Sequence, residues 1–156
     1  MIIDVYRIPP EGGTYSGEEP TSILDVDEGG EVRFRGARRY ELKALLASQE
    51  LIVQGNLSLE AMFRCSRCGE MFAQRVNEPA FECVREVANV NESVDLTPDI
   101  RESMLLALPS YPVCSPGCKG LCSQCGTNLN KSQCTCRSHV ATGWEALDGL
   151  KITKKN

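Results

Sequence analysis

Residues 51–63 read Leu51-Ile-Val-Gln-Gly-Asn-Leu-Ser-Leu-Glu-Ala-Met-Phe63, and an apolar side chain or a glycine stands at every odd position. Most of the even positions carry polar side chains. Successive side chains of a strand point to opposite faces of its sheet, so this period of two predicts a long strand with one buried face. A glycine inside a strand often marks a bulge or a bend, and we therefore expect the strand to bend at Gly55.

Strand signals continue in both directions from this stretch. Residues 40–46 mostly alternate between apolar and polar side chains, and two more strand-like stretches follow the turn at Cys65-Ser-Arg-Cys68-Gly69. Strands joined by tight turns pair antiparallel, so the sequence predicts a body of mainly antiparallel β-sheet, curved or closed into an open barrel. The other expected elements are a strand at 2–8, a Pro- and Gly-rich loop at 9–20, a hairpin of 21–27 with 31–35 around Glu28-Gly29-Gly30, and strands at 71–76 and 80–87.

A helix is expected after these strands, which makes the fold class α+β. Thr97-Pro98-Asp99 has the features of a helix start: a capping hydroxyl, a proline at the first helical position and a carboxylate near the positive end of the helix dipole. Pro109 ends this helix, and a capping box from Thr142 to Glu145 predicts a short last helix. The apolar stripe of the first helix consists of Ile100, Met104, Ala107 and Leu108.

The composition favours a folded chain without a membrane span. Of the 156 residues, 42% are apolar and 24% are charged, which suits one domain with a small appendage. The sequence contains no run of about 18 apolar residues. Its first residues lack the basic and apolar stretches of a secretory signal. We therefore expect a cytoplasmic protein that does not enter the membrane.

The net charge of −4 hides two parts of opposite sign. Residues 1–110 contain eleven lysines and arginines against nineteen acidic residues, whereas residues 111–156 contain six against two. The sequence predicts a β-rich body ending in a helix at 1–110 and a cysteine-rich, metal-binding tail with a short terminal helix at 111–156. A positively charged tail suits an anionic partner such as RNA.

Nine cysteines and a single histidine are the most unusual feature of the composition. Thiols stay reduced in the cytosol, where clustered cysteines are more often metal ligands than disulfides. The clearest zinc-like pair is Cys122-x-x-Cys125, which a glycine follows. A second pair must complete a four-thiolate site. Both the upstream pair Cys114 with Cys118 and the downstream pair Cys134 with Cys136 qualify. The six candidate zinc ligands of the tail are Cys114, Cys118, Cys122, Cys125, Cys134 and Cys136.

Cys65 and Cys68 form another pair of this spacing, at the end of the long strand. Three interpretations remain open: the pair is redox-active, it supplies ligands to a second site together with cysteines of the tail, or it only shapes the hairpin turn. Cys83 alternates with apolar neighbours and is expected in the core.

The expected zinc site is structural rather than catalytic. Zinc bound by four thiolates is saturated, whereas a catalytic zinc keeps an open position and often has histidine or glutamate nearby. The only histidine, His139, comes after the cysteines, and no glutamate stands two residues beyond it. We therefore expect no enzymatic activity and no small-molecule substrate.

One basic cluster interrupts the acidic body at 33–40, where arginines stand among aromatic residues. Such a cluster could clamp phosphates or stack on unpaired bases, and it could equally be a solvated face that balances nearby acidic residues. The candidate RNA-contacting residues are Arg33, Arg35, Arg38, Arg39, Lys119 and Lys131.

These motifs, in this order, resemble the YceD family, the large ribosomal RNA subunit accumulation proteins. The resemblance covers roughly residues 50 to 150, and its most specific part is Cys118-Lys-Gly-Leu-Cys122-x-x-Cys125-Gly-x-Asn128-Leu129-Asn130. The other matching motifs are Cys65-x-x-Cys68, Asp95-Leu96-x-Pro98-x-Ile100-Arg101-Glu102, Leu106-Ala107-Leu108-Pro109, Cys134-x-Cys136 and Trp144-x-x-Leu147-x-x-Leu150.

The resemblance implies a non-enzymatic factor that supports the synthesis, processing or stability of large-subunit ribosomal RNA. Its implied partner is that RNA or a pre-ribosomal protein. The alternative is a zinc-binding protein-interaction or regulatory module that binds no RNA.

Overall fold

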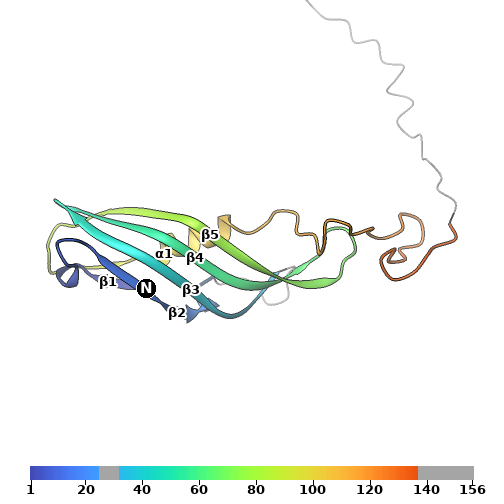
Figure 1. The fold of residues 1–156 in the computed structure, drawn as a ribbon, viewed down its shortest axis with the longest axis horizontal. Coiled ribbons are helices and arrows are strands. Elements are labelled where there is room, and N and C mark those ends of the chain that lie inside the picture. The colour runs from blue at the N-terminus through green and yellow to red at the C-terminus, as the bar shows by residue number, and fades with distance from the viewer. Residues whose placement is uncertain (25–31, 137–156) are drawn as a thin grey trace, which may run out of the picture.

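A four-stranded antiparallel sheet forms most of the molecule (Figure 1). The computed structural model describes residues 1–24 and 32–136. The strand order is β2-β3-β4-β5, so in the described part of the chain β2 and β5 are the two edges of a curved, open sheet. The expected antiparallel body is thereby confirmed. The strand bounds are Gly13–Pro20 for β2, Val32–Ala47 for β3, Glu50–Arg64 for β4 and Met71–Glu86 for β5.

β4 is the long strand that the alternation at 51–63 predicts. Its inward-facing side chains are all buried, and this burial is the main favourable term for the sheet. The pairing of β4 with β5 shifts between Gly55 and Leu57, which confirms an irregularity at the glycine. The bulge lies opposite 79–80, so the two strands predicted at 71–76 and 80–87 are one bulged strand. The buried side chains of β4 are Leu51, Val53, Leu57, Leu59, Ala61 and Phe63.

The N-terminal region differs from the prediction in three places. Residues 13–20, predicted as part of a loop, form the edge strand β2, whose small residues hide its period of two. An edge strand pairs on one side only, so it tolerates glycines and a terminal proline. Two segments predicted as strand form short 3₁₀ helices instead, η1 at Val5–Arg7 and η2 at Thr21–Leu24. The predicted turn at 28–30 lies outside the described residues.

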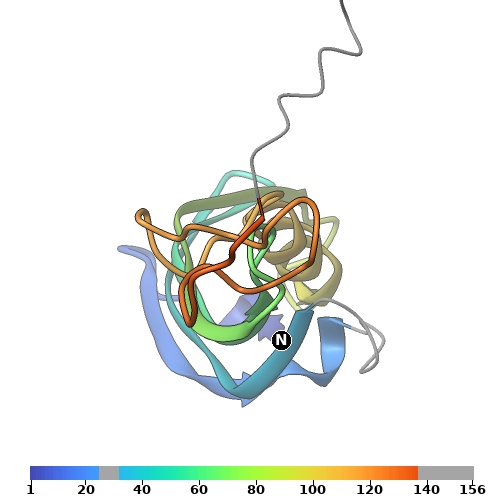
Figure 2. The same cartoon turned by 90° about the vertical axis from the view of Figure 1, so that its right-hand side faces the viewer.

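The predicted helix is α1, Thr97–Leu106, and it packs against β4, β5 and η2. Its Ile100 and Met104 are fully buried, as the apolar stripe predicts. Thr97 does not cap the helix, because it is the first helical residue and Leu96 holds the N-cap position; the Thr97 hydroxyl accepts a hydrogen bond from the Met1 amino group at 2.7 Å. Figure 2, viewed along the long axis, shows the curl of the sheet with α1 beside it. A second, two-stranded sheet pairs β1 (Ile2–Asp4) with β6 (Ser93–Asp95).

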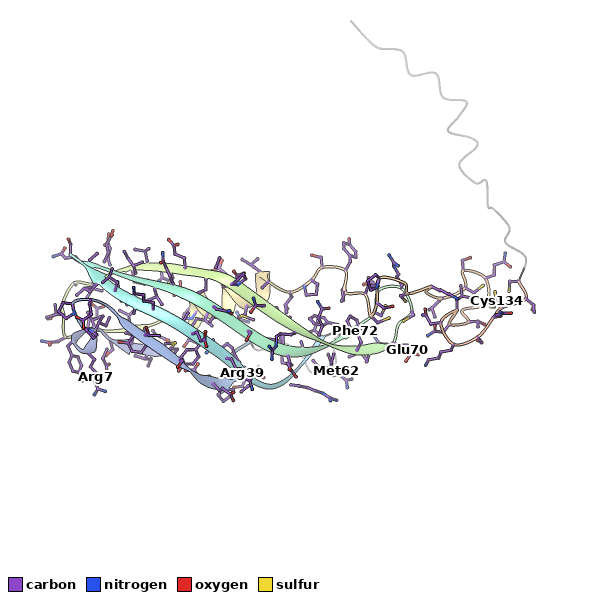
Figure 3. All side chains as sticks on the ribbon, in the orientation of Figure 1. Arg7, Arg39, Met62, Glu70, Phe72 and Cys134 are labelled. Atoms are coloured by element: carbon purple, nitrogen blue, oxygen red, sulfur yellow. The ribbon has the colours of Figure 1, made fainter. Side chains whose placement is uncertain are left out.

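The turn between β4 and β5 lies at one end of the elongated molecule, and the cysteine-rich segment extends beyond it (Figure 1). Figure 3 shows Glu70 at this turn and Cys134 farther out in the same direction. Among the described residues, no helix is long and apolar enough to cross a membrane.

Candidate metal centres

The β4–β5 turn presents two thiols at the tip of the hairpin. The Cys65 N–H donates to the Glu70 carbonyl at 2.8 Å, and the Gly69 N–H donates back to the Cys65 carbonyl at 2.9 Å. Gly69 has a φ of 73°, a conformation that glycine adopts without the cost a side chain would add. This tight knuckle places the sulfur atoms of Cys65 and Cys68 in one group.

Two cysteines of the tail complete this group. The sulfur atoms of Cys65, Cys68, Cys114 and Cys118, which we call the first centre, all lie within 4.8 Å of one another. The Sγ atoms of Cys65 and Cys118 are 3.8 Å apart, and so are those of Cys68 and Cys114. Four sulfurs at about 2.3 Å around a tetrahedral zinc ion would stand about 3.8 Å apart. The first centre therefore has the size of a four-thiolate metal site.

Backbone hydrogen bonds join the tail to the hairpin around the first centre. The Ser66 N–H donates to the Pro112 carbonyl at 2.8 Å, and the Leu121 N–H donates to the Arg67 carbonyl at 3.0 Å. The Arg67 guanidinium donates to the Cys118 carbonyl at 3.2 Å. Cys65, Cys68 and Cys118 are buried, and Phe72 and Val113 pack against them.

The thiols of the first centre have pKa values shifted in opposite directions. Burial raises the pKa of Cys65, but N–H groups of Cys114, Cys68 and Arg67 outweigh it and lower that pKa to about 6. Partial desolvation and the neighbouring thiols raise the pKa of Cys114 to about 12. A metal ion would supply the positive charge that four adjacent thiolates require.

A second centre repeats the knuckle farther along the tail. The Cys122 N–H donates to the Thr127 carbonyl at 2.8 Å, the Gly126 N–H donates to the Cys122 carbonyl at 2.9 Å, and Gly126 has a φ of 71°. These are the same contacts and the same glycine conformation as in the hairpin knuckle. The sulfur atoms of Cys122, Cys125, Cys134 and Cys136, which we call the second centre, also lie within 4.8 Å of one another.

The second centre is more open than the first, and none of its four cysteines is buried. N–H groups of Cys125 and Gln124 lower the pKa of Cys122 to about 6. A contact with the Cys125 thiol and partial desolvation raise the pKa of Cys136 to about 12. The Cys122 and Cys134 sulfurs are 3.5 Å apart, so this centre too has the dimensions of a four-thiolate site.

The structure resolves which cysteines lie together. Each predicted ligand of the tail belongs to one centre, and the geometry favours the interpretation in which Cys65 and Cys68 share a site with tail cysteines. Cys83 lies in the core, apart from both centres. The first centre takes two ligands from each side of the predicted boundary at residue 110, and that division stays a prediction. His139 and the predicted last helix lie outside the described residues.

Sequence reasoning gave no role to three residues that contact the centres. Arg67 binds the Cys118 carbonyl, the Thr127 hydroxyl lies 3.1 Å from the Cys125 sulfur, and the Asn130 amide lies 3.3 Å from the Cys118 sulfur. Asn130 stands in the most specific part of the family motif, which is the one signal that could have pointed to it.

The prediction that Arg38 contacts RNA is wrong for this fold, because its side chain is 0% exposed. Arg38 points into the body, where its Nη2 atom pairs with the carboxylate of Glu19. Burial lowers the pKa of Arg38, and Glu19 opposes that effect. Among the predicted RNA contacts, Arg33, Arg35, Arg39 and Lys119 are exposed, and Lys131 is exposed but pairs with Glu70 at 2.7 Å.

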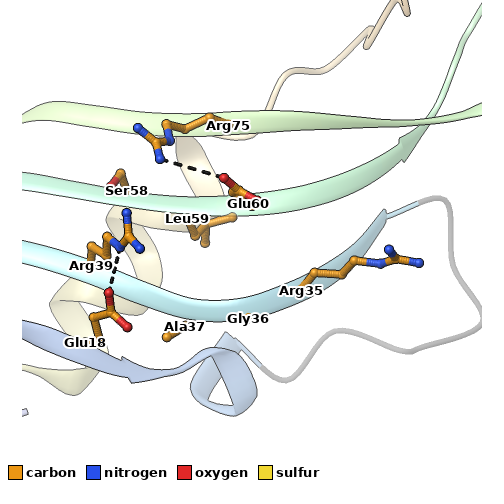
Figure 4. Close-up of a pocket in the computed structure, with 9 residues that line it drawn as sticks. All are labelled: Glu18, Arg35, Gly36, Ala37, Arg39, Ser58, Leu59, Glu60 and Arg75. Atoms are coloured by element: carbon orange, nitrogen blue, oxygen red, sulfur yellow. Dashed lines mark hydrogen bonds and ion pairs between the residues drawn. The ribbon is translucent and has the colours of Figure 1, made fainter.

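Arg35, Arg39 and Arg75 border a shallow pocket of about 150 Å³ on the outer face of the sheet (Figure 4). Arg39 pairs with Glu18 at 2.7 Å, and Arg75 pairs with Glu60 at 3.7 Å. Figure 4 shows Arg35 extending away from both carboxylates. Arg75 is the residue of this group that sequence reasoning missed, because no other basic residue lies near it in the sequence.

An antiparallel sheet with two cysteine knuckles defines a β protein whose cysteine clusters could each hold a metal ion, and sequence comparison places the chain in a family. The sequence model described as "Large ribosomal RNA subunit accumulation protein YceD" matches residues 53–151. This match spans more than half of the chain, and the chain therefore belongs to the YceD family.

Similar proteins occur in plants and in bacteria. The chain is 39% identical over 61 residues to the Zea mays protein named large ribosomal RNA subunit accumulation protein YCED homolog 1, chloroplastic; this covers 38% of the chain and 21% of that protein. The Arabidopsis thaliana protein of the same name is 34% identical over 61 residues, covering 38% of the chain and 19% of that protein. An uncharacterized protein of Mycobacterium bovis is 31% identical over 103 residues, covering 57% of the chain and 50% of that protein.

The matched regions therefore span half or less of the length of each of these relatives. No solved structure matches the chain.

Proposed function

We propose that this protein is a non-enzymatic factor that supports the accumulation of large-subunit ribosomal RNA, and that it holds one structural zinc ion in each cysteine centre. The observation that carries the role is membership of a family described by large-subunit RNA accumulation. Two plant relatives bear the same description in their names.

The chemistry of the donors supports zinc in a structural role. Soft thiolates in a tetrahedral group favour zinc or an iron–sulfur site, and zinc adds no redox chemistry. Four cysteines per centre would occupy all four coordination positions of a tetrahedral ion, so no position is left for a substrate or an activated water. When bound, the ions would fix a segment that has few apolar side chains of its own.

The proposed partner is ribosomal RNA, contacted by the outer face of the sheet. Arg33 and Arg35 are exposed there, and Arg39 and Arg75 form ion pairs whose side chains are more than half exposed. Exposed pairs of this kind contribute about 0–1 kcal/mol, so a phosphate can replace the carboxylate at little cost.

The role is tested by deleting the gene in its host and measuring the ratio of large-subunit to small-subunit RNA. We expect this ratio to fall, and we expect the tagged full-length protein to sediment with large-subunit precursors. An unchanged ratio together with a protein found only at the top of the gradient would contradict the role. Salt-insensitive binding to a protein partner, with no RNA in the complex, would support the alternative of a protein-interaction module.

The RNA surface makes a separate prediction. We expect Arg33→Ala with Arg35→Ala to weaken binding of large-subunit RNA fragments. The negative slope of log affinity against log salt should become shallower by about 1.4, because each lost phosphate contact removes about 0.7 from its magnitude. A filter-binding salt series measures both quantities. Arg7→Ala with Arg101→Ala removes the same charge away from this face and should leave the slope unchanged; equal effects of both pairs would argue against a defined surface.

A further inference from the structure

Asn130 belongs to the loop of the second centre but contacts the first. It lies between Cys125 and Cys134, two ligands of the second centre. Its Nδ2 atom donates to the Cys118 sulfur of the first centre at 3.3 Å. No other side-chain amide in the described part of the chain makes such a contact with a cysteine of the first centre.

The orientation of this amide is fixed by its neighbours. The Oδ1 atom of Asn130 accepts from the Lys119 N–H at 2.8 Å, so the Nδ2 atom must point the other way. The Nδ2 group carries two N–H bonds. One is directed to the Cys118 sulfur at 3.3 Å and the other to the Asn128 Oδ1 atom at 3.0 Å. Both N–H bonds and the carbonyl oxygen of the side chain are therefore engaged.

The loop that carries Asn130 folds back toward the hairpin. The Leu129 N–H donates to the Gly120 carbonyl at 2.9 Å, and the Lys131 ammonium pairs with Glu70 at 2.7 Å. Glu70 directly follows the hairpin knuckle of the first centre. The two ends of the loop are the ligands Cys125 and Cys134, so a metal ion in the second centre would close it.

We infer that the two centres bind their metal ions cooperatively, with Asn130 as the residue that couples them. An ion in the second centre closes the loop and holds the Asn130 amide on the Cys118 thiolate. That hydrogen bond favours the charged ligand and strengthens the first centre, since outer partners of ligands change metal affinity by about 10–100-fold. By linkage, an ion in the first centre strengthens the second by the same factor. This inference rests on the proposal that both centres bind zinc.

The test uses Asn130→Ala in the full zinc-loaded chain, challenged with increasing concentrations of a competing chelator. Native mass spectrometry counts the retained ions, and iodoacetamide labelling of freed thiols identifies which centre has emptied. We expect the first centre to empty at a chelator concentration about 10–100-fold lower than in the wild type. Gln133→Ala, on the same loop, should not shift the curve. Circular dichroism checks that the sheet is intact.

Two further variants separate coupling from loop shape. Asn130→Asp keeps an acceptor for the Lys119 N–H but removes the donor to Cys118, so it should weaken the first centre at least as much as Asn130→Ala; recovery by Asn130→Asp would overturn the inference. Cys134→Ser with Cys136→Ser should shift the first centre as Asn130→Ala does, and combining all three changes should add no further shift.

Shifts that multiply in the combined variant, or a first centre unmoved by Asn130→Ala, would likewise overturn the coupling while leaving the proposed zinc sites in place. A wild-type chain that retains no zinc would instead contradict the proposed metal role on which the inference rests.

Discussion

Cys65→Ser combined with Cys68→Ser is expected to free the tail from the hairpin while the sheet stays folded. Both ligands of the first centre that come from the body are lost, and a serine hydroxyl does not replace a thiolate on zinc. Structural zinc contributes on the order of 10 kcal/mol to the folding of small domains that depend on it. We expect the remaining links, which are the backbone hydrogen bonds of Ser66 and Leu121 and the side-chain contacts of Arg67 and Lys131, to be too weak to hold the segment alone.

Hydrogen exchange measures this outcome directly. In the variant, the Ser66 and Leu121 amides should lose their protection, whereas amides inside β3 and β4 should keep theirs. Cys83→Ala is the matched control, because it removes a buried thiol that belongs to the core rather than to either centre. Protected Ser66 and Leu121 amides in the double variant would show that the tail is held without the first centre.

Gly55→Ala is expected to destabilise the sheet by about 3 kcal/mol or more, because a methyl group has no space at this position. A Cβ atom on Gly55 would lie 2.1 Å from the Glu41 carbonyl oxygen and 2.9 Å from the Leu42 Cα atom. Both contacts are with the backbone of β3, the neighbouring strand, so relief requires β3 and β4 to separate where Leu42 pairs with Gly55. The core residue Leu57 next to the bulge would move with them.

Thermal unfolding of the zinc-loaded protein tests this prediction. We expect the melting temperature of Gly55→Ala to fall by roughly 6–12 °C. Gly117→Ala is the control, since a Cβ atom there would meet no heavy atom within 4 Å and Gly117 has no positive φ. It should change stability by less than about 0.5 kcal/mol. Equal, small effects of the two substitutions would contradict the close approach of β3 to Gly55.

The sequence predicts the parts of this fold in which local pattern and tertiary environment agree. The alternation at 51–63 and the helix that begins at Thr97 are predicted correctly, since one face of each element is buried, whereas the predicted Thr97 cap is wrong because Leu96 holds the N-cap position. β2 is missed because glycines and small polar residues give its two faces little contrast. Its strand character comes from pairing with β3, which no local window of sequence contains.

The candidate metal centres, too, could be predicted from the sequence only in part. The spacing of the cysteines predicts metal ligands, but the choice of partners depends on a contact between the hairpin at 65–68 and the segment at 114–118. The error at Arg38 has a different cause. Alternation along β3 already places Arg38 on the face opposite Arg35 and Arg39, yet the charge cluster grouped all three. The burial of Arg38 beside Glu19 shows that the alternation of side chains predicts the position of Arg38 better than the charge cluster does.

The zinc content of the purified chain tests the central claim, that eight cysteines form two four-thiolate centres, one of them shared by the body and the tail. Native mass spectrometry should find two zinc ions in the wild type, and one each in Cys65→Ser with Cys68→Ser and in Cys122→Ser with Cys125→Ser. One zinc ion in the wild type and an unchanged single ion in the variant with Cys65→Ser and Cys68→Ser would contradict the account.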